Sequence, residues 1–311
     1  MNDEFPLVSI IAACYNHALF VVEALESIKN QTYPNIQLIV TNDASTDKSK
    51  KLIESWISQQ EFAVHLISNE TNKGVCYTFN KALKQVKGQY FQVISCDDVM
   101  LLNKIQQQVD FLESASEEFA MVCTDAQVID QNSNLTHASF LDFWNLPTDL
   151  PENAYKQLLL QNTILAPSVL IRTAVLDEVG YYDESLCFED WDMWLRISKN
   201  YKIKMWTYPL VNYRHFATSF SQSNSYRPAI LKDSIKLLDK QRGYSKEIDS
   251  LVAQAQRPRI IELIENNDAS IGHLWKKLKY DKTVYSLFLF LCSLVGINQQ
   301  KAHAIKTMIK Q

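Results

Sequence analysis

The sequence predicts an α/β fold followed by a mainly helical C-terminal extension. Two observations lead to this prediction. Within the first hundred residues, β-rich segments alternate with segments of helical apolar spacing, which is typical of a parallel sheet covered by helices. Beyond about residue 225 the strand signals fade and the pattern becomes helical.

Four strands are expected in the first hundred residues, with helical segments between them. The strands are predicted over residues 7–14, 36–42, 63–68 and 89–95, and the helices over residues 20–31, 45–60 and 75–86. Ser45 or Thr46 is expected to cap the second helix, with Asp47 in its first turn, because side-chain oxygens accept the free N–H groups there.

Later segments complete a first domain, predicted over residues 1–222 with halves at 1–100 and 101–222; the helical extension takes residues 223–311. Two prolines and clustered aromatic side chains in residues 140–155 indicate a surface loop. Helices are expected over residues 104–114 and 190–198, and strands over residues 119–130 and 168–172.

The composition is that of a globular protein, and it argues against a nucleic-acid partner. Hydrophobic residues make up 47% and charged residues 21%, and the net charge of −4 gives no support to a nucleic-acid partner. Six cysteines are scattered without a CxxC pair, so neither a zinc site nor a disulfide framework is indicated. The acidic N-terminus does not resemble a signal peptide, and we expect a cytoplasmic location.

The C-terminal forty residues have a charge and an apolar pattern of their own. Residues 272–311 hold seven lysines against one acid, a net charge of +6. Residues 284–297 form an apolar run of fourteen, shorter than the roughly 20 that a spanning helix needs. This run either packs as a helical subdomain or homodimer contact, or lies in a membrane interface with its lysines facing anionic headgroups at the inner face of the cytoplasmic membrane.

Polar residues follow three of the expected strands where each strand ends. In open α/β sheets ligands bind beyond the carboxyl ends of the strands, so these residues line one rim if the strands are parallel neighbours. Adjacent carboxylates repel, and a bound cation would make the last pair tolerable; a solvated pair that caps the next helix is the alternative. The residues are Tyr15 and Asn16, Asn42 and Asp43, and Asp97 and Asp98.

Five segments, in their order, resemble glycosyltransferase family 2, whose members are inverting, sugar-nucleotide-dependent enzymes with the GT-A fold, a mixed sheet with flanking helices. The resemblance covers roughly the first 220 residues, and joint occurrence is more specific than any single motif. It implies that residues 1–100 form a nucleotide-binding half and residues 101–222 an acceptor half. The segments are "VSIIAACYNH", "NDASTDKS", "NKGVCYTFNKAL", "SCDDVM" and "EVGYYDESLCFEDWDMWLRIS".

The resemblance implies a set of nucleotide-binding and metal-binding residues. Tyr15 offers a ring on which a pyrimidine stacks, and Asp43 an acceptor for a uracil N3–H. Asp98 is expected to bind Mn²⁺ or Mg²⁺, with His215 as a further ligand, because these ions prefer oxygen ligands and substrate phosphates. The expected nucleotide-binding residues are Ala13, Tyr15, Asn16, Asp43, Asn72, Gly74, Asn80 and Asp97.

For catalysis, the resemblance makes Asp190 the general base, Glu189 its partner and Trp191 an acceptor contact. The expected reaction is inverting transfer from a UDP-sugar, or secondarily a dTDP-sugar, to a saccharide or lipid-linked acceptor in bacterial surface polysaccharide synthesis. Acids at a helix start also act simply as dipole partners, which is the alternative for this pair.

Two other functions stay open, and three departures from the family pattern motivate the second of them. Ala13 replaces a common proline, Asn42 the first aspartate of the second motif, and Phe79 a frequent arginine. A nucleotidyltransferase that makes sugar nucleotides is one rival, although "AACYNHALF" lacks the usual Gly-rich phosphate loop. A non-catalytic carbohydrate-binding protein is the other.

Overall fold

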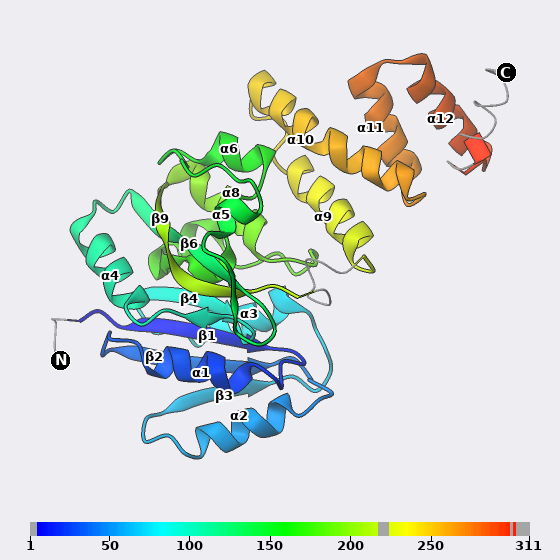
Figure 1. Ribbon diagram of the computed structural model, residues 1–311. Coiled ribbons are helices and arrows are strands. Elements are labelled where there is room, and N and C mark those ends of the chain that lie inside the picture. Colours follow the sequence, from blue (N-terminus) through cyan, green and yellow to red (C-terminus); the bar gives the residue numbers. More distant parts are fainter. Residues whose placement is uncertain (1–4, 217–223, 299–300, 303–311) are drawn as a thin grey trace. The chain divides into compact units, whose positions relative to one another are not determined.

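The computed structural model describes residues 5–216, 224–298 and 301–302 (Figure 1). The chain divides into two compact units. The main unit ends at residue 217 and leaves out Leu159–Gln161, which group with the C-terminal unit. The boundary expected between residues 222 and 223 lies outside the described residues.

A single mixed sheet of nine strands forms the centre of the main unit, in the part of the chain that the structure describes. Strands β1, β2, β3 and β4 are parallel neighbours, whereas β8 pairs antiparallel with both β4 and β6. The strand order is β3-β2-β1-β4-β8-β6-β9-β5, with β7 paired to β6. The strands are β1 (Val8–Cys14), β2 (Ile36–Asn42), β3 (Val64–Ser68), β4 (Tyr90–Ser95), β5 (Val99–Met100), β6 (Phe119–Ile129), β7 (Leu135–His137), β8 (Leu170–Arg172) and β9 (Lys202–Arg214).

Helices flank this sheet, and together they bury β1 and β4 on both faces. Along β1 the side chains from Val8 to Ala12 are fully buried. The helices are α1 (Val21–Lys29), α2 (Ser49–Ile57), α3 (Val75–Leu83), α4 (Lys104–Ser114), α5 (Phe140–Phe143), α6 (Tyr155–Leu160), α7 (Leu176–Val179) and α8 (Asp190–Asn200). Two short 3₁₀ turns, Ala166–Ser168 and Thr173–Val175, flank β8.

Three local expectations differ from the structure. Helix α2 begins at Ser49, so the expected cap at Ser45 or Thr46 is wrong; Asp47 accepts the Ser49 N–H instead (2.8 Å). The segment 140–155 contains the one-turn helix α5, which the Ser139 hydroxyl caps. Strand β9 was not expected, because its thirteen residues alternate between the polar and apolar classes too irregularly to indicate a strand.

The C-terminal unit is helical, as expected. Leu231, Ile235, Ile260 and Leu263 form one small core, and Leu274, Leu289 and Cys292 contribute to a second. Within the described residues, no helix combines the length and the apolar character needed to cross a membrane. The helices are α9 (Arg227–Asp239), α10 (Lys246–Glu265), α11 (Ile271–Asp281) and α12 (Val284–Leu294).

Candidate active site

The carboxyl ends of β1, β2 and β4 form one rim, as the sequence predicts. Ala13 pairs with Thr41 on one side and Ser95 on the other, so the three strands end at the same level. The chain beyond each strand stays attached to its neighbour, because the Asp43 N–H donates to the Cys14 carbonyl (2.9 Å) and the Cys96 N–H to the Ala13 carbonyl (2.8 Å). The expected polar residues therefore emerge side by side.

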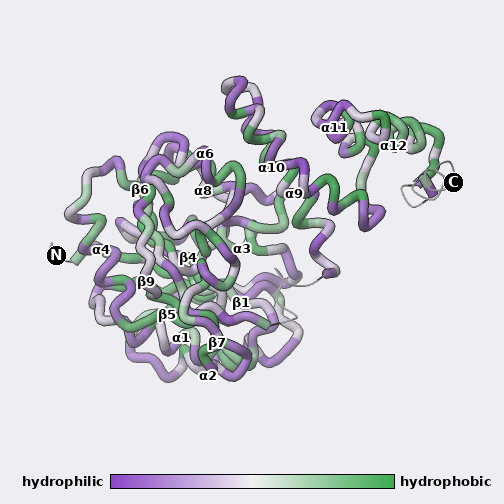
Figure 2. Tube along the Cα trace, turned by 45° about the horizontal axis from the view of Figure 1, so that its top comes forward, coloured by the Kyte–Doolittle hydropathy of each residue, from purple (hydrophilic) through white to green (hydrophobic). Residues whose placement is uncertain are grey.

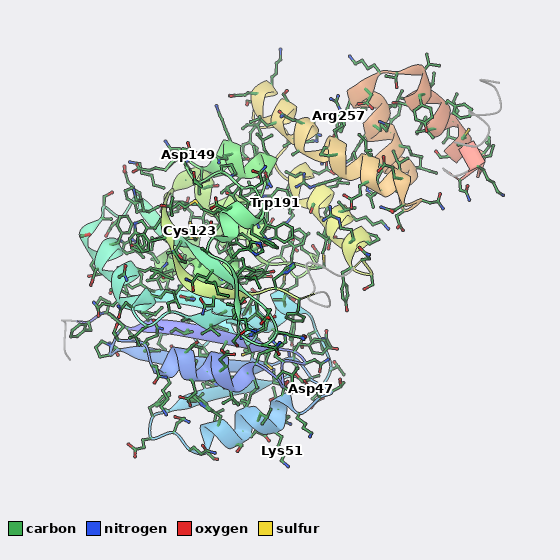
Figure 3. All side chains as sticks on the ribbon, in the orientation of Figure 1. Asp47, Lys51, Cys123, Asp149, Trp191 and Arg257 are labelled. Atoms are coloured by element: carbon green, nitrogen blue, oxygen red, sulfur yellow. The ribbon has the colours of Figure 1, made fainter. Side chains whose placement is uncertain are left out.

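Asn16 shapes this rim by joining the loops after β1 and β2. Its backbone is left-handed (φ 59°), a conformation that asparagine tolerates. Its Oδ1 accepts the Thr46 N–H (2.8 Å), and its own N–H donates to the Ser45 hydroxyl (3.0 Å). Asp47, labelled in Figure 3, adds a bond from the Ala18 N–H (3.0 Å). The neighbouring Tyr15 is left 43% exposed, and its ring is available to a ligand.

Asp43 has hydrogen bonds to the chain on both carboxylate oxygens. Oδ1 accepts from the Asn69 amide and the Lys73 N–H, both at 2.9 Å. Oδ2 accepts one bond, from the Gly74 N–H at 2.9 Å. Since each carboxylate oxygen accepts about two hydrogen bonds, one acceptor position remains, on Oδ2.

Helix α3 connects this rim to a second group of acids. Gly74 precedes the helix with φ 86°, which only glycine adopts readily, and so brings its N–H to Asp43. At the other side of the helix, the Asn80 amide donates to the Tyr182 carbonyl and to Glu184, and accepts the Tyr182 N–H (all 2.9 Å). Asn80 thus holds the loop that leads to α8. Its amide is occupied within the protein, whereas Asn72, the remaining residue expected here, is exposed.

Asp97 and Asp98 lie in the turn between β4 and β5 and have different surroundings. The Asp97 Oδ2 lies 3.7 Å from the His17 Nε2, and its buried Oδ1 has no hydrogen-bond partner among the described residues. Asp98 is 3% exposed, and its Oδ1 accepts the Arg214 N–H (2.9 Å). Burial, and then the charge of Asp97, raise the pKa of the Asp98 carboxyl.

A buried arginine, Arg214 at the end of β9, holds this turn in place. Its Nε donates to the Asp97 carbonyl (2.7 Å), and its Nη2 pairs with Glu23 of α1 (2.6 Å). Its Nη1 donates to the Asp130 carbonyl (2.9 Å) and the Ser133 hydroxyl (3.0 Å). The guanidinium also lies over the Phe20 ring, 4.6 Å from the centroid. Arg214 and His17 were not expected in the site, since their partners are distant in sequence.

The residues of this turn fit a divalent cation. The Asp98 carboxylate is buried, and the adjacent Asp97 carboxylate has an oxygen without a partner in the described chain. Both offer hard oxygen ligands, and a bound cation would reduce the repulsion between their charges. No group of three or more metal-ligating side chains occurs within the described residues, so the remaining ligands would come from phosphate and water. His215 has its Nε2 buried without a partner in the described chain, and its ring lies against Phe143 (5.2 Å) and Trp144 (5.9 Å).

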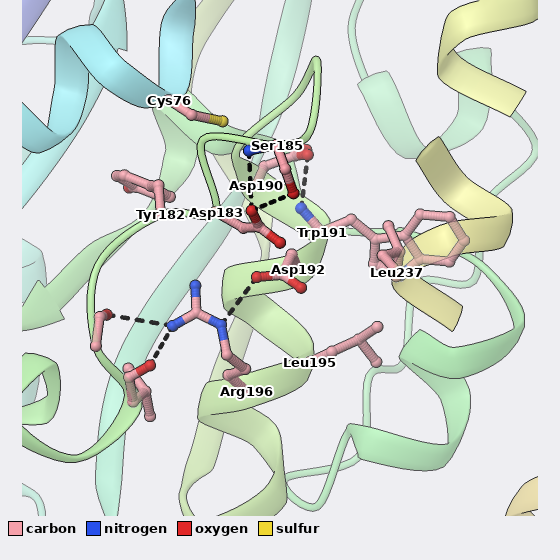
Figure 4. A network of polar contacts seen from close by, with 12 residues as sticks. Cys76, Tyr182, Asp183, Ser185, Asp190, Trp191, Asp192, Leu195, Arg196 and Leu237 are labelled. Carbon is pink, nitrogen blue, oxygen red and sulfur yellow. Dashed lines mark hydrogen bonds and ion pairs between the residues drawn. The ribbon is translucent and has the colours of Figure 1, made fainter. Parts of the chain in front are cut away.

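Glu189 and Asp190 stand at the start of α8 and form the second acidic group. Figure 4 shows Asp190 and its bond to the Trp191 N–H. Asp190 accepts the Trp191 N–H on Oδ1 (2.6 Å) and the Asn162 amide on Oδ2 (2.7 Å). Burial raises the pKa of Asp190. Burial, followed by the charge of Asp190, raises the pKa of Glu189 to about 8. The pair therefore keeps one proton near neutral pH.

Trp191, expected as an acceptor contact, is buried in the structure. The side chain is 4% exposed, and its indole N–H donates to the Leu158 carbonyl (2.7 Å). The sequence spacing alone, with Trp194 three residues later, is equally typical of core packing.

Comparison with known proteins identifies the family. The family model for glycosyl transferase family 2 matches residues 9–180, more than half of the chain. The chain belongs to glycosyl transferase family 2. The matched segment contains the strand-end rim, the turn of Asp97 and Asp98, and helix α3, but it ends before Asp190.

Two curated glycosyltransferases resemble this chain over part of their length. An uncharacterized glycosyltransferase of Rickettsia typhi is 32% identical over 204 residues, which cover 64% of this chain and 62% of that protein. A putative teichuronic acid biosynthesis glycosyltransferase, TuaG of Bacillus subtilis, is 29% identical over 120 residues, 39% of this chain and 47% of the relative. The match to these curated relatives thus spans less than two thirds of their length.

Solved structures confirm the expected GT-A fold of this family 2 member. S. aureus TarS 1-349, solved in complex with UDP-GlcNAc, has a TM-score of 0.68 at 15% identity and covers 98% of this chain and 92% of its own. The mannosyltransferase PcManGT of Pyrobaculum calidifontis, in complex with GDP-Man and Mn²⁺, has a TM-score of 0.62 at 17% identity and covers 99% and 89%. At these identities the likeness establishes the fold.

The contacts of Arg214 predict that its substitution weakens ligand binding at the rim. In Arg214→Lys the charge remains but the fork that joins Glu23, Asp97 and Asp130 is lost. We expect Mn²⁺-dependent binding of UDP, measured by calorimetry, to weaken by roughly 10–100-fold, as for other residues that orient metal ligands. Arg172→Lys is the matched control, because Arg172 makes similar bonds at the opposite end of β4, to Tyr90 and Phe119. Equal losses in both variants would contradict a positioning role.

The raised pKa of Glu189 predicts a pH-dependent stability. Its folded value, about 8, exceeds the ordinary glutamate value of 4.5, so its contribution to stability is full below pH 4.5 and is lost as pH rises through 8. Glu189→Gln removes this loss. We expect the Tm of the variant, relative to wild type, to increase by several degrees between pH 5 and pH 8.5 in calorimetry. Glu117→Gln, at an exposed glutamate, serves as the control and should show a Tm difference from wild type that does not change with pH. A pH-independent Tm difference in Glu189→Gln as well would contradict the raised pKa.

Proposed function

We propose that this chain is a metal-dependent, inverting glycosyltransferase that uses a UDP-sugar donor, with a dTDP-sugar as the second choice. The observation that carries the proposal is one unit that combines the strand-end carboxylates Asp43, Asp97 and Asp98 with the acids Glu189 and Asp190 at the start of α8. Binding of a nucleoside diphosphate needs the first group, and activation of an acceptor hydroxyl needs the second.

The hydrogen bonds of Asp43 favour a pyrimidine donor over a guanine donor. Its carboxylate keeps one acceptor position, on Oδ2, after the bonds from Asn69, Lys73 and Gly74. Uracil and thymine each offer a single N3–H donor, whereas guanine offers N1–H together with its amino group. One acceptor position matches the former, and the exposed Tyr15 ring supplies a stacking surface for the same base.

The turn after β4 is assigned to the diphosphate. Asp98 and Asp97 would hold Mn²⁺ or Mg²⁺, which supplies positive charge to the leaving diphosphate when bound. Arg214 holds the backbone of this turn, and His17 lies beside Asp97. His215, at the end of β9, is proposed as a further polar group facing this site, with its Nε2 free of partners within the described chain.

Asp190 is assigned as the general base. Two N–H donors, from Trp191 and Asn162, stabilise its carboxylate, so the shared proton resides on Glu189 up to about pH 8. Each Asp190 oxygen accepts only one of these bonds and retains a position for an acceptor hydroxyl. Asp190 would take the proton of this hydroxyl while its oxygen attacks the anomeric carbon of the donor from the side opposite the diphosphate. The new C–O bond forms as the bond to the diphosphate breaks, so the configuration at that carbon inverts.

The acceptor is proposed to be a saccharide or a lipid-linked saccharide in the synthesis of a bacterial surface polysaccharide. The support is the relative TuaG, whose name refers to teichuronic acid biosynthesis, and the similar fold of TarS. We propose that the reaction takes place on the cytoplasmic side of the membrane, where nucleotide sugars are made and lipid-linked acceptors are available.

A donor panel tests the proposed function. With Mn²⁺ present, we expect release of UDP from at least one UDP-sugar and binding of UDP that is at least tenfold tighter than that of GDP, because Asp43 leaves one acceptor position. The measurements are a nucleoside diphosphate release assay and calorimetry. Turnover of GDP-sugars alone would contradict the pyrimidine assignment, and absence of binding and turnover across the panel would overturn the function.

Two substitutions separate the roles of the acidic groups. Asp190→Asn removes the base, and we expect turnover to fall by at least 10²-fold while UDP and Mn²⁺ still bind. Asp98→Asn leaves Asp190 intact, and we expect UDP binding to lose its dependence on Mn²⁺. Parallel kinetics and calorimetry on both variants check this division. Wild-type turnover in Asp190→Asn would refute the base assignment.

A further inference from the structure

Helix α12 of the C-terminal unit presents an apolar face that no described residue covers. Positions separated by three, four and seven residues lie on one side of a helix, and five such side chains are 44–86% exposed. The opposite side of the helix, with Leu289 and Cys292, is buried against α11. We call the exposed side the α12 face; it consists of Val284, Leu287, Leu291, Leu294 and Val295. Figure 2 shows this helix as mainly hydrophobic.

Helix α11 adds an aromatic ring and free positive charge next to the α12 face. Trp275 is 44% exposed and lies 5.2 Å, between ring centroids, from Phe290 of α12. The ammonium of Lys279 lies over the Trp275 ring at 5.1 Å. Tryptophan and lysine side by side are typical of a membrane interface, because each has an apolar body and a polar end.

The lysines of this region divide into paired and unpaired groups. Lys276 pairs with Asp239, and Lys277 pairs with Asp281 (2.5 Å). Lys279 and Lys282 are exposed, and neither has a carboxylate partner within the described residues. The single acid from α11 to α12, Asp281, is also bound by Arg257 (2.9 Å). The surface around the α12 face therefore carries uncompensated positive charge.

We propose that the α12 face docks on the surface of an anionic lipid bilayer. The apolar side chains would enter the boundary between headgroups and acyl chains, and Lys279 and Lys282 would contact acidic headgroups. The eleven residues of α12 are too few to span a bilayer, which makes the helix lie in the interface. Charge favours this occupant over a second copy, because two identical lysine-flanked faces repel each other.

Flotation of the full chain with vesicles tests the proposal. We expect binding to vesicles of phosphatidylcholine with phosphatidylglycerol, and weak binding to phosphatidylcholine alone. Lys279→Gln with Lys282→Gln should weaken binding by roughly 30-fold, since each lysine near an anionic surface contributes about a factor of five. Leu287→Glu with Leu291→Glu should abolish binding to both vesicle types. Leu102→Glu, at a leucine 56% exposed in the main unit, is the matched control and should bind as wild type.

Other results would overturn the docking surface. They are binding that is indifferent to phosphatidylglycerol, wild-type binding by Leu287→Glu with Leu291→Glu, or no vesicle binding together with a dimeric mass that this variant makes monomeric in light scattering. Because the substituted side chains are exposed, circular dichroism and thermal melts should match wild type. Turnover of nucleotide sugars in solution is measured separately, so failure here leaves the proposed reaction unaffected.

Discussion

The position of the acidic turn in the main unit depends on one buried arginine. The guanidinium of Arg214 uses four of its five N–H groups to join α1, the turn after β4 and the chain after β6, while its backbone N–H binds Asp98. A buried charge with one partner removed costs several kcal/mol, so these contacts are mutually dependent. The geometry of Asp97 and Asp98 therefore follows from long-range packing as well as from the turn itself.

Adjacent carboxylates occur at the start of α8 and in the turn after β4, and their mutual repulsion is reduced differently at each. At α8 a shared proton suffices, because burial raises the pKa of Glu189 to about 8 while N–H donors stabilise Asp190. At the turn after β4 the Asp97 Oδ1 has no partner among the described residues, and a cation would supply one. The first arrangement suits proton transfer and the second suits binding of a diphosphate.

Helix α3 links the strand-end rim at Asp43 to the loop before α8 inside the same unit. Gly74, which precedes the helix, donates its N–H to Asp43, and one face of the helix holds the loop before α8 through Cys76 and Asn80. The Asn80 amide, which the family resemblance assigns to the nucleotide, makes its hydrogen bonds to Tyr182 and Glu184 of this loop.

The α/β class, the four parallel strands and the rim of polar residues follow from the sequence, because hydrophobic periodicity and strand-end composition are local properties. The sequence also indicates the acid pair at α8. The burial of Trp191, the pairing of β9 with β6, and the places of Arg214 and His17 at the rim emerge from the fold, since they depend on partners up to 191 residues away. Local patterns specify which residues are polar, but packing specifies what each one faces.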